Sequence, residues 1–600
     1  MAEKFFSERN LKFLLHEVHQ AQDLTGFAYF AEHSRESFDL VLDTAARLAR
    51  DVLKPAHREM DQKPPVFENG RVKVHPLVRP LMKECGAGGW IAAQSPFEAG
   101  GQQLPTMINA ACAFIMNAAN FSASVYPFLT AGAAELIESF GSEELKTTFI
   151  PKMHSGEWQG TMALTEPQAG SSLSDITTLA EPTDQGYYLL RGQKIFISAG
   201  DHDGVDNIVH LLLAKIKGAP PGVKGISLFV APKLRPGPGG LEFNDLNVAG
   251  IYHKLGYRGC PLTQLSLGEN NDCRGWLVGE AHRGLPYMFQ MMNGARIGVG
   301  IQAAAIASAA YYDSLEYART RLQGRRLTSK DPTTPQIPIL EHADVKRMLL
   351  FQRAVVEGSL GLLLQVSRYA DLAKAAEGED QEKYALLLDL LTPVAKTYPS
   401  EMGILAVSQA LQILGGYGYC DEFPVEQHFR DMRIHPIHEG TTGIQGLDLL
   451  GRKVVMKQGR ALSLYLEELE KTAAAASADE VLAPYGRRLS EASGKLKEVT
   501  GRLIGLALEG QVDLFLADST LYLEFFGIIA LAWQWLLQGL ALRQGLAGRP
   551  SEAEAGFYQG KLAAMKFFFH YELPKIQGLV GRLLESDGLV LSVDSGFLAD

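Results

Sequence analysis

One carboxylate in this chain stands among residues that would make it a proton acceptor. Glu439 is followed by glycine and two threonines, and isoleucines occupy positions 434, 437 and 444. A carboxylate in apolar surroundings has a raised pKa and is suited to general-base work. The same residue types also fit a solvent-exposed turn, so this segment alone does not define an activity.

Two further segments combine glycine with small polar residues. The first, Met162–Ser171, reads MALTEPQAGS, and the second, Gln412–Tyr419, reads QILGGYGY. The pair Gly415 and Gly416 lets backbone amides approach a pyrophosphate or another part of the backbone closely. Each segment by itself is also compatible with a simple turn or a helix end.

Other cofactor chemistries are disfavoured. A G-x-G-x-x-A string at Gly298, Gly300 and Ala303 lies inside a helical pattern and does not follow a strand, so it fails the test for a nicotinamide-binding turn. The run His435-Pro-Ile-His438-Glu439 could bind a metal, but the proline breaks helical spacing and no further ligand stands nearby. We expect no metal.

The elements that must position these segments change character along the chain. Before about residue 160, apolar residues recur at helical spacing. From Met162 to about Val278, short β-type runs alternate with turn residues, which favours a small β-barrel or sandwich. One run, Gly186–Ser198, is expected to form two strands around a Gly-Gln turn. The pattern is helical again from about Leu285, with a linker or loose turn at Ala473–Ala478.

The layout therefore predicts several domains, as expected for 600 residues. They are an N-terminal helical extension, an α domain, a β domain, an α-helical domain that carries Glu439, and an additional C-terminal helical domain. The expected bounds are 1–40, 41–160, 161–284, 285–455 and 456–600.

The composition excludes some partners. The formal net charge is -11, which argues against nucleic acid because phosphate binding needs clustered lysine and arginine. The five cysteines include no C-x-x-C pair and are interpreted as reduced thiols of a cytoplasmic protein.

No secretory signal is visible at the N-terminus. The apolar run Phe525–Leu542 approaches membrane-span length, but the interior pair Gln534 and Gln538 favours a buried helix without stable membrane insertion.

The three segments, in this order and on this layout, resemble the acyl-CoA dehydrogenase family over about residues 40–455. Details such as Lys224-Gly-Ile-Ser-Leu-Phe and Gly443-Ile-Gln-Gly-Leu-Asp resemble its larger branch, which carries N- and C-terminal extensions. That branch includes enzymes that act on 3-methylthiopropionyl-CoA and on fatty acyl-CoAs. The resemblance implies a mainly α fold with a central β domain: an N-terminal α-helical domain, a middle β-barrel, a C-terminal four-helix bundle and an extra C-terminal helical domain.

The resemblance also implies roles for particular residues. In the family, the glutamate before Gly-Thr removes the α proton of the thioester, and its position here is Glu439. The β hydrogen leaves as a hydride, which no side chain can accept, so FAD is implied. Arg321 and Gln323 match residues that reach FAD in a neighbouring subunit. The implied cofactor contacts are Leu164, Thr165, Phe196, Ser198, Arg321, Gln323, Gln412, Gly415, Gly416 and Thr441. The implied substrate contacts are Ser171, Arg296, His438 and Gly440.

This sequence departs from the family pattern at several positions. Phe196 occupies the usual tryptophan position, and Ser172 stands where aspartate is common. His438 replaces the tyrosine that usually precedes the base; a protonated imidazole would lower the pKa of Glu439, whereas a neutral one would do little. Ala295 occupies the alternative base position of a family subset and cannot serve, which leaves Glu439.

We therefore expect an FAD-dependent acyl-CoA dehydrogenase of fatty acid β-oxidation that forms a trans-2,3-enoyl-CoA. The resemblance implies an electron-transferring flavoprotein as acceptor, and the last helices suggest a homodimer because they would cover a surface that tetrameric relatives bury. An acyl-CoA oxidase that passes electrons to oxygen, an inactive homologue and a non-catalytic nucleic-acid-binding homologue are the alternatives. Straight-chain fatty, methylthio, branched and aryl-propionyl thioesters are all open as substrates.

Overall fold

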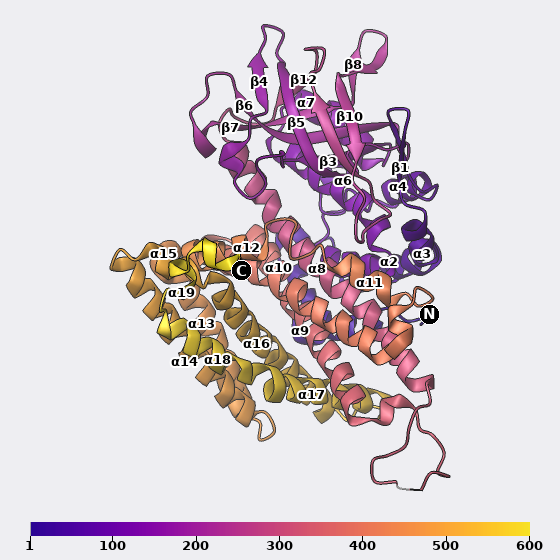
Figure 1. Cartoon of the computed structure of the whole chain (residues 1–600), viewed down its shortest axis with the longest axis vertical. Coiled ribbons are helices and arrows are strands. Elements are labelled where there is room, and N and C mark those ends of the chain that lie inside the picture. Colours follow the sequence, from indigo (N-terminus) through magenta and orange to yellow (C-terminus); the bar gives the residue numbers. More distant parts are fainter. Residues whose placement is uncertain (1, 330, 600) are drawn as a thin grey trace. The chain divides into compact units, whose positions relative to one another are not determined.

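The computed structural model describes residues 2–329 and 331–599 (Figure 1). The chain forms two compact units. The helical unit comprises Met1–Asp39, Pro105–Phe114 and Arg296–Asp600, and the sheet unit comprises Leu40–Leu104 and Ile115–Ala295. The helices whose bounds span both units are α2 (Arg35–Leu48), α5 (Thr106–Ala119) and α8 (Gly284–Thr320). The domain bounds expected from the sequence stay predictions.

The sheet unit contains all twelve strands, β1 to β12, that the structure describes. Its own helices are α3 (Lys54–Gln62), α4 (Val78–Ala87), α6 (Phe121–Phe140) and α7 (Glu143–His154). Its strands are β1 (Val66–Glu68), β2 (Arg71–Lys73), β3 (Trp158–Ala163), β4 (Leu179–Pro182), β5 (Tyr188–Ser198), β6 (Asn207–Ile216), β7 (Ile226–Pro232), β8 (Leu234–Gly237), β9 (Gly240–Phe243), β10 (Leu246–Ile251), β11 (Leu262–Leu267) and β12 (Arg274–Leu277).

Five of these strands close into a ring. β5 pairs with β12, β12 with β7, β7 with β6, β6 with β4, and β4 again with β5. β11 and β10 extend the sheet from β5, and β3 extends it from β6. Closure pairs the backbone groups that a sheet edge would expose. The predicted β-barrel is confirmed.

Strand β5 is a single strand, so the prediction of two strands around a turn is wrong. Its first half, up to Arg191, pairs with β4, and its second half, from Gly192, pairs with β11. Gly192 stands where the partner changes, and a Cβ added there would lie 2.5 Å from Thr178 Oγ1. This glycine permits a close backbone approach rather than a reversal of the chain.

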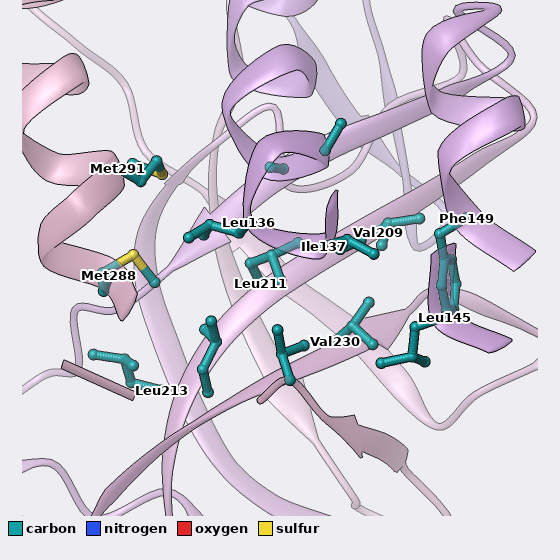
Figure 2. Packing of buried hydrophobic residues seen from close by; sticks show 14 of the residues in the cluster. Leu136, Ile137, Leu145, Phe149, Val209, Leu211, Leu213, Val230, Met288 and Met291 are labelled. Atoms are coloured by element: carbon teal, nitrogen blue, oxygen red, sulfur yellow. The ribbon is translucent and has the colours of Figure 1, made fainter. Parts of the chain in front are cut away.

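Strand β6 separates two apolar clusters because both of its faces are buried. Val209, Leu211 and Leu213 face a cluster with residues of α6, α7, β7 and α8 (Figure 2), whereas Leu212 and Ala214 face a second cluster. Burial on both faces explains why this strand reads as a continuous apolar run. In the first cluster, the labelled residues from other elements are Leu136, Ile137, Leu145, Phe149, Val230, Met288 and Met291.

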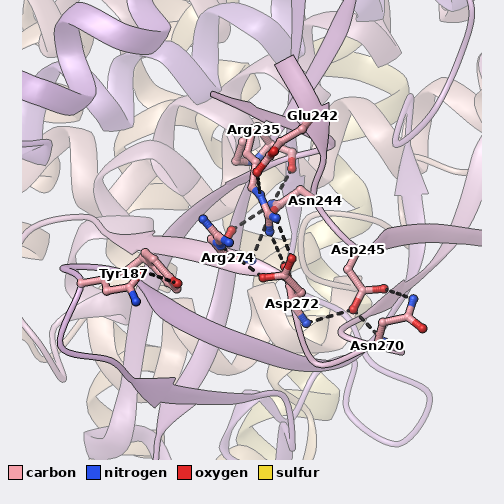
Figure 3. Close-up of polar contacts among 10 residues, drawn as sticks. Tyr187, Arg235, Glu242, Asn244, Asp245, Asn270, Asp272 and Arg274 are labelled. Atoms are coloured by element: carbon pink, nitrogen blue, oxygen red, sulfur yellow. Dashed lines mark hydrogen bonds and ion pairs between the residues drawn. The ribbon is translucent and has the colours of Figure 1, made fainter. Parts of the chain in front are cut away.

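A polar network ties the β8–β9 hairpin to the start of β12 (Figure 3). Arg235 donates to Glu242 Oε1 at 2.7 Å and to Asp272 Oδ2 at 2.6 Å. Asp272 also accepts from Arg274 Nε at 3.2 Å. Two carboxylates therefore share the charge of one buried guanidinium and hold the hairpin in place.

The helical unit contains the long helices of the second half of the chain. Besides its parts of α2, α5 and α8, its α-helices are α1 (Glu8–Lys12), α9 (Ala343–Ala375), α10 (Gly378–Leu414), α11 (Val425–Met432), α12 (Thr442–Asp448), α13 (Met456–Ser477), α14 (Ala483–Leu508), α15 (Val512–Ala517), α16 (Ser519–Ala547), α17 (Glu552–Phe567), α18 (Ile576–Glu585) and α19 (Leu589–Ser592). The run Ala473–Ala478, expected as a linker, is almost wholly the end of α13. Alanine has the highest helix propensity, and Ala476 packs in the core at 0% exposure.

Helix α16 contains the apolar run Phe525–Leu542 and is a core helix. Gln534 and Gln538 are fully buried, and a Cβ at Gly361 of α9 would lie 3.1 Å from Gln538 Nε2. Trp535 Nε1 donates to the carbonyl of Ala354 in α9 at 3.0 Å. Among the described residues, α9 and α16 have the length and hydropathy of a membrane span, and 89% of each apolar window is buried inside the structure.

Candidate functional site

Glu439 lies on the segment that leads from α11 into α12, which we call the base loop (His435–Thr442); its last residue, Thr442, is also the first residue of α12. The loop folds back on itself, since the Thr442 amide donates to the Pro436 carbonyl at 3.0 Å and the His438 amide donates to Ile434 at 3.1 Å. Glu439 and Gly440 both adopt left-handed backbone conformations, with φ values of 53° and 89°. A left-handed non-glycine residue is uncommon and is retained where the surroundings hold it in place.

Two interactions join the base loop to α12. The side-chain Nε2 of Gln445 donates to the carbonyls of Glu439 and Gly440 at 3.1 and 3.4 Å. The Thr441 hydroxyl caps α12 by accepting from the Ile444 amide at 3.4 Å. Thr441, a predicted flavin contact, therefore has a local role in beginning this helix.

The electrostatic surroundings of Glu439 suit a base. Burial raises the pKa of its carboxyl, and the positive charges of Arg296 and Lys396 oppose that rise. Arg296 is itself buried and pairs with Asp448, with 2.8 Å between Arg296 Nη1 and Asp448 Oδ2. Glu439 is thus a carboxyl with raised basicity beside cations that keep its ionised form accessible.

His438 is neutral near neutral pH. Burial lowers the pKa of His438 well below its usual value, and His435 and Lys396 lower it further. Burial also lowers the pKa of His435 to about 4. The two rings lie 5.4 Å apart, edge to face. The sequence left open whether the imidazole of His438 is protonated or neutral. The structure supports a neutral imidazole, which adds no charge beside Glu439.

The sheet unit brings its predicted flavin contacts together. Leu164 and Thr165 directly follow β3, and the Ile195 amide of β5 donates to the Thr165 carbonyl at 2.9 Å. Phe196 and Ser198 lie on the same stretch of β5. Phe196 is 52% exposed, and its backbone is left-handed with φ 57°. An exposed aromatic ring beside a strand end presents a flat apolar surface.

A buried ion pair that the sequence did not predict supports this stretch of predicted flavin contacts. Lys194 Nζ lies 2.8 Å from Glu166 Oε1 and donates to the Leu164 carbonyl at 3.1 Å. Glu166 also accepts from the amide of Thr177 at 2.6 Å and from that of Thr178 at 3.1 Å. In the sequence, Lys194 follows Arg191 and Gln193 in the same strand, so nothing marks it as a buried lysine with a partner.

Ser171 lies in an exposed loop of the sheet unit. The neighbouring Ser172 donates to Asp175 Oδ2 at 2.6 Å and shares a hydrogen bond with Ser174 at 2.9 Å. Ser172 therefore still orders the short helical turn that follows, although aspartate is common at its position.

The remaining predicted contacts lie at helix ends of the helical unit. Arg321 and Gln323 follow the end of α8 and are exposed, and Gln412 is exposed at the end of α10. Gly415 ends α10 with φ 60°, and a Cβ added to Gly415 or Gly416 would meet nothing within 4 Å. The glycine pair thus forms both a helix end and an open stretch of backbone.

Comparison with known proteins identifies the family along most of the chain. Sequence profiles of the acyl-CoA dehydrogenase N-terminal, middle and C-terminal domains match residues 35–157, 161–269 and 282–454. A profile described as acetyl-CoA dehydrogenase C-terminal like matches residues 465–594.

Curated relatives match almost the whole chain. It is 35% identical to 3-methylmercaptopropionyl-CoA dehydrogenase of Ruegeria pomeroyi, over 97% of this chain and 98% of the relative. It is 34% identical to a butyryl-CoA dehydrogenase of Syntrophomonas wolfei, over 97% of both chains. This chain therefore belongs to the acyl-CoA dehydrogenase family, a family of oxidoreductases whose cofactor is FAD.

Solved structures show the same fold. Caenorhabditis elegans ACDH-11 in complex with C11-CoA superposes with a TM-score of 0.76 at 19% identity, covering 99% of this chain and 96% of the other. An acyl-CoA dehydrogenase of Bacillus anthracis complexed with FAD gives 0.73 at 21% identity, covering 95% and 90%.

The residues present fit FAD. Phe196 follows Ile195, whose amide donates to Thr165, and its exposed ring offers a surface for an isoalloxazine ring, because flat aromatic systems stack on one another. The open backbone at Gly415 and Gly416 permits a close approach by a phosphate-bearing or nucleoside group.

Proposed function

We propose that this protein oxidises an acyl-CoA thioester between its α and β carbons to a trans-2,3-enoyl-CoA, with Glu439 as the base that takes the α proton. The main support for this proposal is that Glu439 has a raised pKa and lies on a loop whose backbone is left-handed at Glu439 and Gly440. FAD, when bound, supplies the hydride acceptor that side chains cannot provide.

The surroundings of Glu439 support this role. A base that works near neutral pH needs a pKa nearer to that range than an exposed glutamate has. Burial raises the pKa of Glu439, whereas Arg296 and Lys396 limit the rise. Because His438 is neutral, it adds no positive charge that would weaken the base. The loop therefore carries one carboxylate that has a raised pKa and can still ionise.

The remaining site residues are proposed in the roles that the family implies. Arg321 and Gln323 reach FAD of a neighbouring subunit, which agrees with their exposure. Ser171, Arg296, His438 and Gly440 line the acyl-CoA side. The flavin contacts are Leu164, Thr165, Phe196, Ser198, Gln412, Gly415, Gly416 and Thr441.

We further propose that an electron-transferring flavoprotein reoxidises this homodimeric, cytoplasmic enzyme and that it acts in fatty acid β-oxidation. Those proposals follow from family membership and from the additional C-terminal helices. Oxygen as the acceptor would instead make the protein an acyl-CoA oxidase. Comparing reoxidation of the reduced enzyme by oxygen and by an electron-transferring flavoprotein separates the two functions.

The test is an anaerobic titration of the FAD-bound protein with butyryl-, octanoyl-, palmitoyl- and 3-methylthiopropionyl-CoA, following the flavin absorbance. We expect one chain class to bleach the flavin rapidly. Glu439→Gln should keep its FAD and lose the bleaching. If no thioester bleaches the wild-type flavin, or if the variant bleaches as fast, the proposed function is wrong.

A further inference from the structure

Helix α10 holds the base loop at both ends. Lys396 Nζ donates to the carbonyl of His435, the first residue of the loop, at 2.6 Å. Glu401, five positions further along the same helix, accepts a hydrogen bond from the hydroxyl of Thr442, the last residue of the loop. Two side chains of one rigid element therefore fix where the loop begins and where it ends.

A lysine is an unusual residue at the buried position 396. Its side chain is fully buried, and the nearby α10 residues Leu390, Leu391, Val394 and Ala395 are also fully buried. Burial lowers the pKa of the lysine to about 8, although Glu401 and Glu439 favour its charged form. A buried ammonium is costly unless carboxylates and hydrogen bonds compensate it. An apolar residue would fill the core here at lower cost, so packing alone does not account for this lysine.

The charged and titratable groups around Lys396 come from several elements. Glu401 lies on α10 itself, His435, His438 and Glu439 lie on the base loop, and Arg296 lies on α8. Arg296 is paired with Asp448 of α12, which neutralises part of its charge. Both histidines are held neutral by burial. Lys396 is therefore, after Arg296, the second positive charge that favours the ionised form of Glu439.

We propose that Lys396 and Glu401 form a clamp on α10 that positions Glu439, and that the ammonium of Lys396 also favours the ionised base. Lys396 is in this sense a positioning residue, since it acts through the His435 carbonyl and through its charge. This inference rests on the proposed function only in naming Glu439 as the base. The clamp itself concerns the geometry and ionisation of the loop.

The clamp makes a prediction about geometry that needs no substrate. In Lys396→Met of the FAD-bound protein, amide hydrogen exchange across residues 435–442 should rise by about tenfold or more, because local opening becomes easier. Glu401→Gln should loosen the same segment less, since an amide still accepts a hydrogen bond from Thr442. Lys396→Arg, which keeps a charged donor, should restore most of the protection.

The charge makes a second prediction. Titration of Glu439 can be followed by carbon-13 NMR of glutamate carboxyls, as the difference between the protein and its Glu439→Gln variant. Removing a nearby cation raises a carboxyl pKa, so we expect Lys396→Met to move the Glu439 titration upward by about one pH unit. Lys396→Arg should leave it close to its original position.

Lys561 provides a matched control, because it is a second fully buried lysine of the same unit with a pKa lowered to about 8. It pairs with Glu357 at 2.7 Å and lies on α17. Lys561→Met should lower the melting temperature yet leave both the exchange of residues 435–442 and the Glu439 titration unchanged.

The clamp is refuted if Lys396→Met changes neither readout, or if Lys561→Met changes both as much. It is also refuted if Lys396→Arg restores neither readout. Failure of the proposed function would appear elsewhere, as a wild-type protein whose flavin no thioester bleaches. The exchange and titration experiments would still decide on the clamp in that case.

Discussion

At the residue scale, the account depends on one carboxylate whose ionisation is balanced by its neighbours. Because burial raises the pKa of Glu439 and the proposed base is its deprotonated form, activity should be lost as the pH falls through that raised pKa. The thioester-dependent rate of flavin reduction should therefore rise with pH in a single step. The midpoint of this step, which we call the acid limb, follows the pKa of Glu439 and so depends on the charges around it.

Asp448→Asn should move this limb to lower pH. Asp448 neutralises Arg296 at 2.8 Å, so its removal exposes Glu439 to more positive charge and lowers the pKa of the base. We expect a shift of about half a pH unit, measured by stopped-flow flavin reduction across a pH series. A limb that stays in place or moves upward would show that Arg296 does not act on the base.

The ion pair of Lys194 and Glu166 gives a prediction about stability. Both side chains are buried, and removing one partner leaves an uncompensated charge. Lys194→Met should lower the free energy of unfolding of the sheet unit by about 3–5 kcal/mol in urea. Lys194→Met combined with Glu166→Leu should recover part of that loss. A single variant as stable as the wild type would contradict this interpretation.

The site residues that the sequence predicts are those that lie inside recognisable sequence motifs. Glu439, the glycine pair and the Thr165 segment were identified because a motif surrounds each of them. Lys194 and Lys396 were not predicted, since neither lysine stands in a motif that indicates its partner. Their partners, Glu166 and the His435 carbonyl, come close only after folding.

At the element scale, the barrel depends on one strand that changes partners. Gly192→Ala places a Cβ 2.5 Å from Thr178 Oγ1, where β5 passes from β4 to β11. Overpacking of this kind costs about 1–3 kcal/mol. We expect a loss of that size in urea unfolding, together with weaker FAD retention because Phe196 lies further along β5.

Gly250 of β10 is the matched position, because a Cβ added there meets nothing within 4 Å. Gly250→Ala should change the free energy of unfolding by less than about 0.5 kcal/mol. Equal effects of the two variants would mean that strand propensity, rather than the close approach at Gly192, limits the barrel.

The errors at the element scale share one physical cause. A glycine inside an apolar run signals either a turn or a close approach, and only the neighbouring strand distinguishes them. An alanine run reads as a flexible linker or as a helix according to whether a partner covers it. In α13, the carbonyl of Ala473 would lie 2.8 Å from a Cβ at Gly486 of α14, so the two helices pack closely there.

At the scale of the whole molecule, the two extensions predicted at the chain ends pack together within the helical unit. Arg9 of α1 pairs with Glu554 of α17 at 2.6 Å, and Lys561 donates to Asn10 at 2.7 Å. Sequence analysis predicted each extension but not their contact, because nothing in either segment identifies a partner hundreds of residues away.

The oligomeric state is a prediction at this scale. If the additional helices cover the surface that tetrameric relatives bury, the protein should sediment as a dimer, at twice the mass of the 65.5 kDa chain. Analytical ultracentrifugation over a range of concentrations measures this directly. A stable tetramer would show that the additional helices leave that surface available.

The central claim is that Glu439 removes the α proton of an acyl-CoA thioester. Its most direct test is exchange of the α hydrogen with solvent deuterium in the FAD-bound protein, followed by NMR of a bleaching thioester or of an analogue that cannot be desaturated. The account predicts exchange with the wild type and none with Glu439→Gln that still binds FAD and thioester. Exchange at an undiminished rate in the variant would contradict it and assign proton removal to another group.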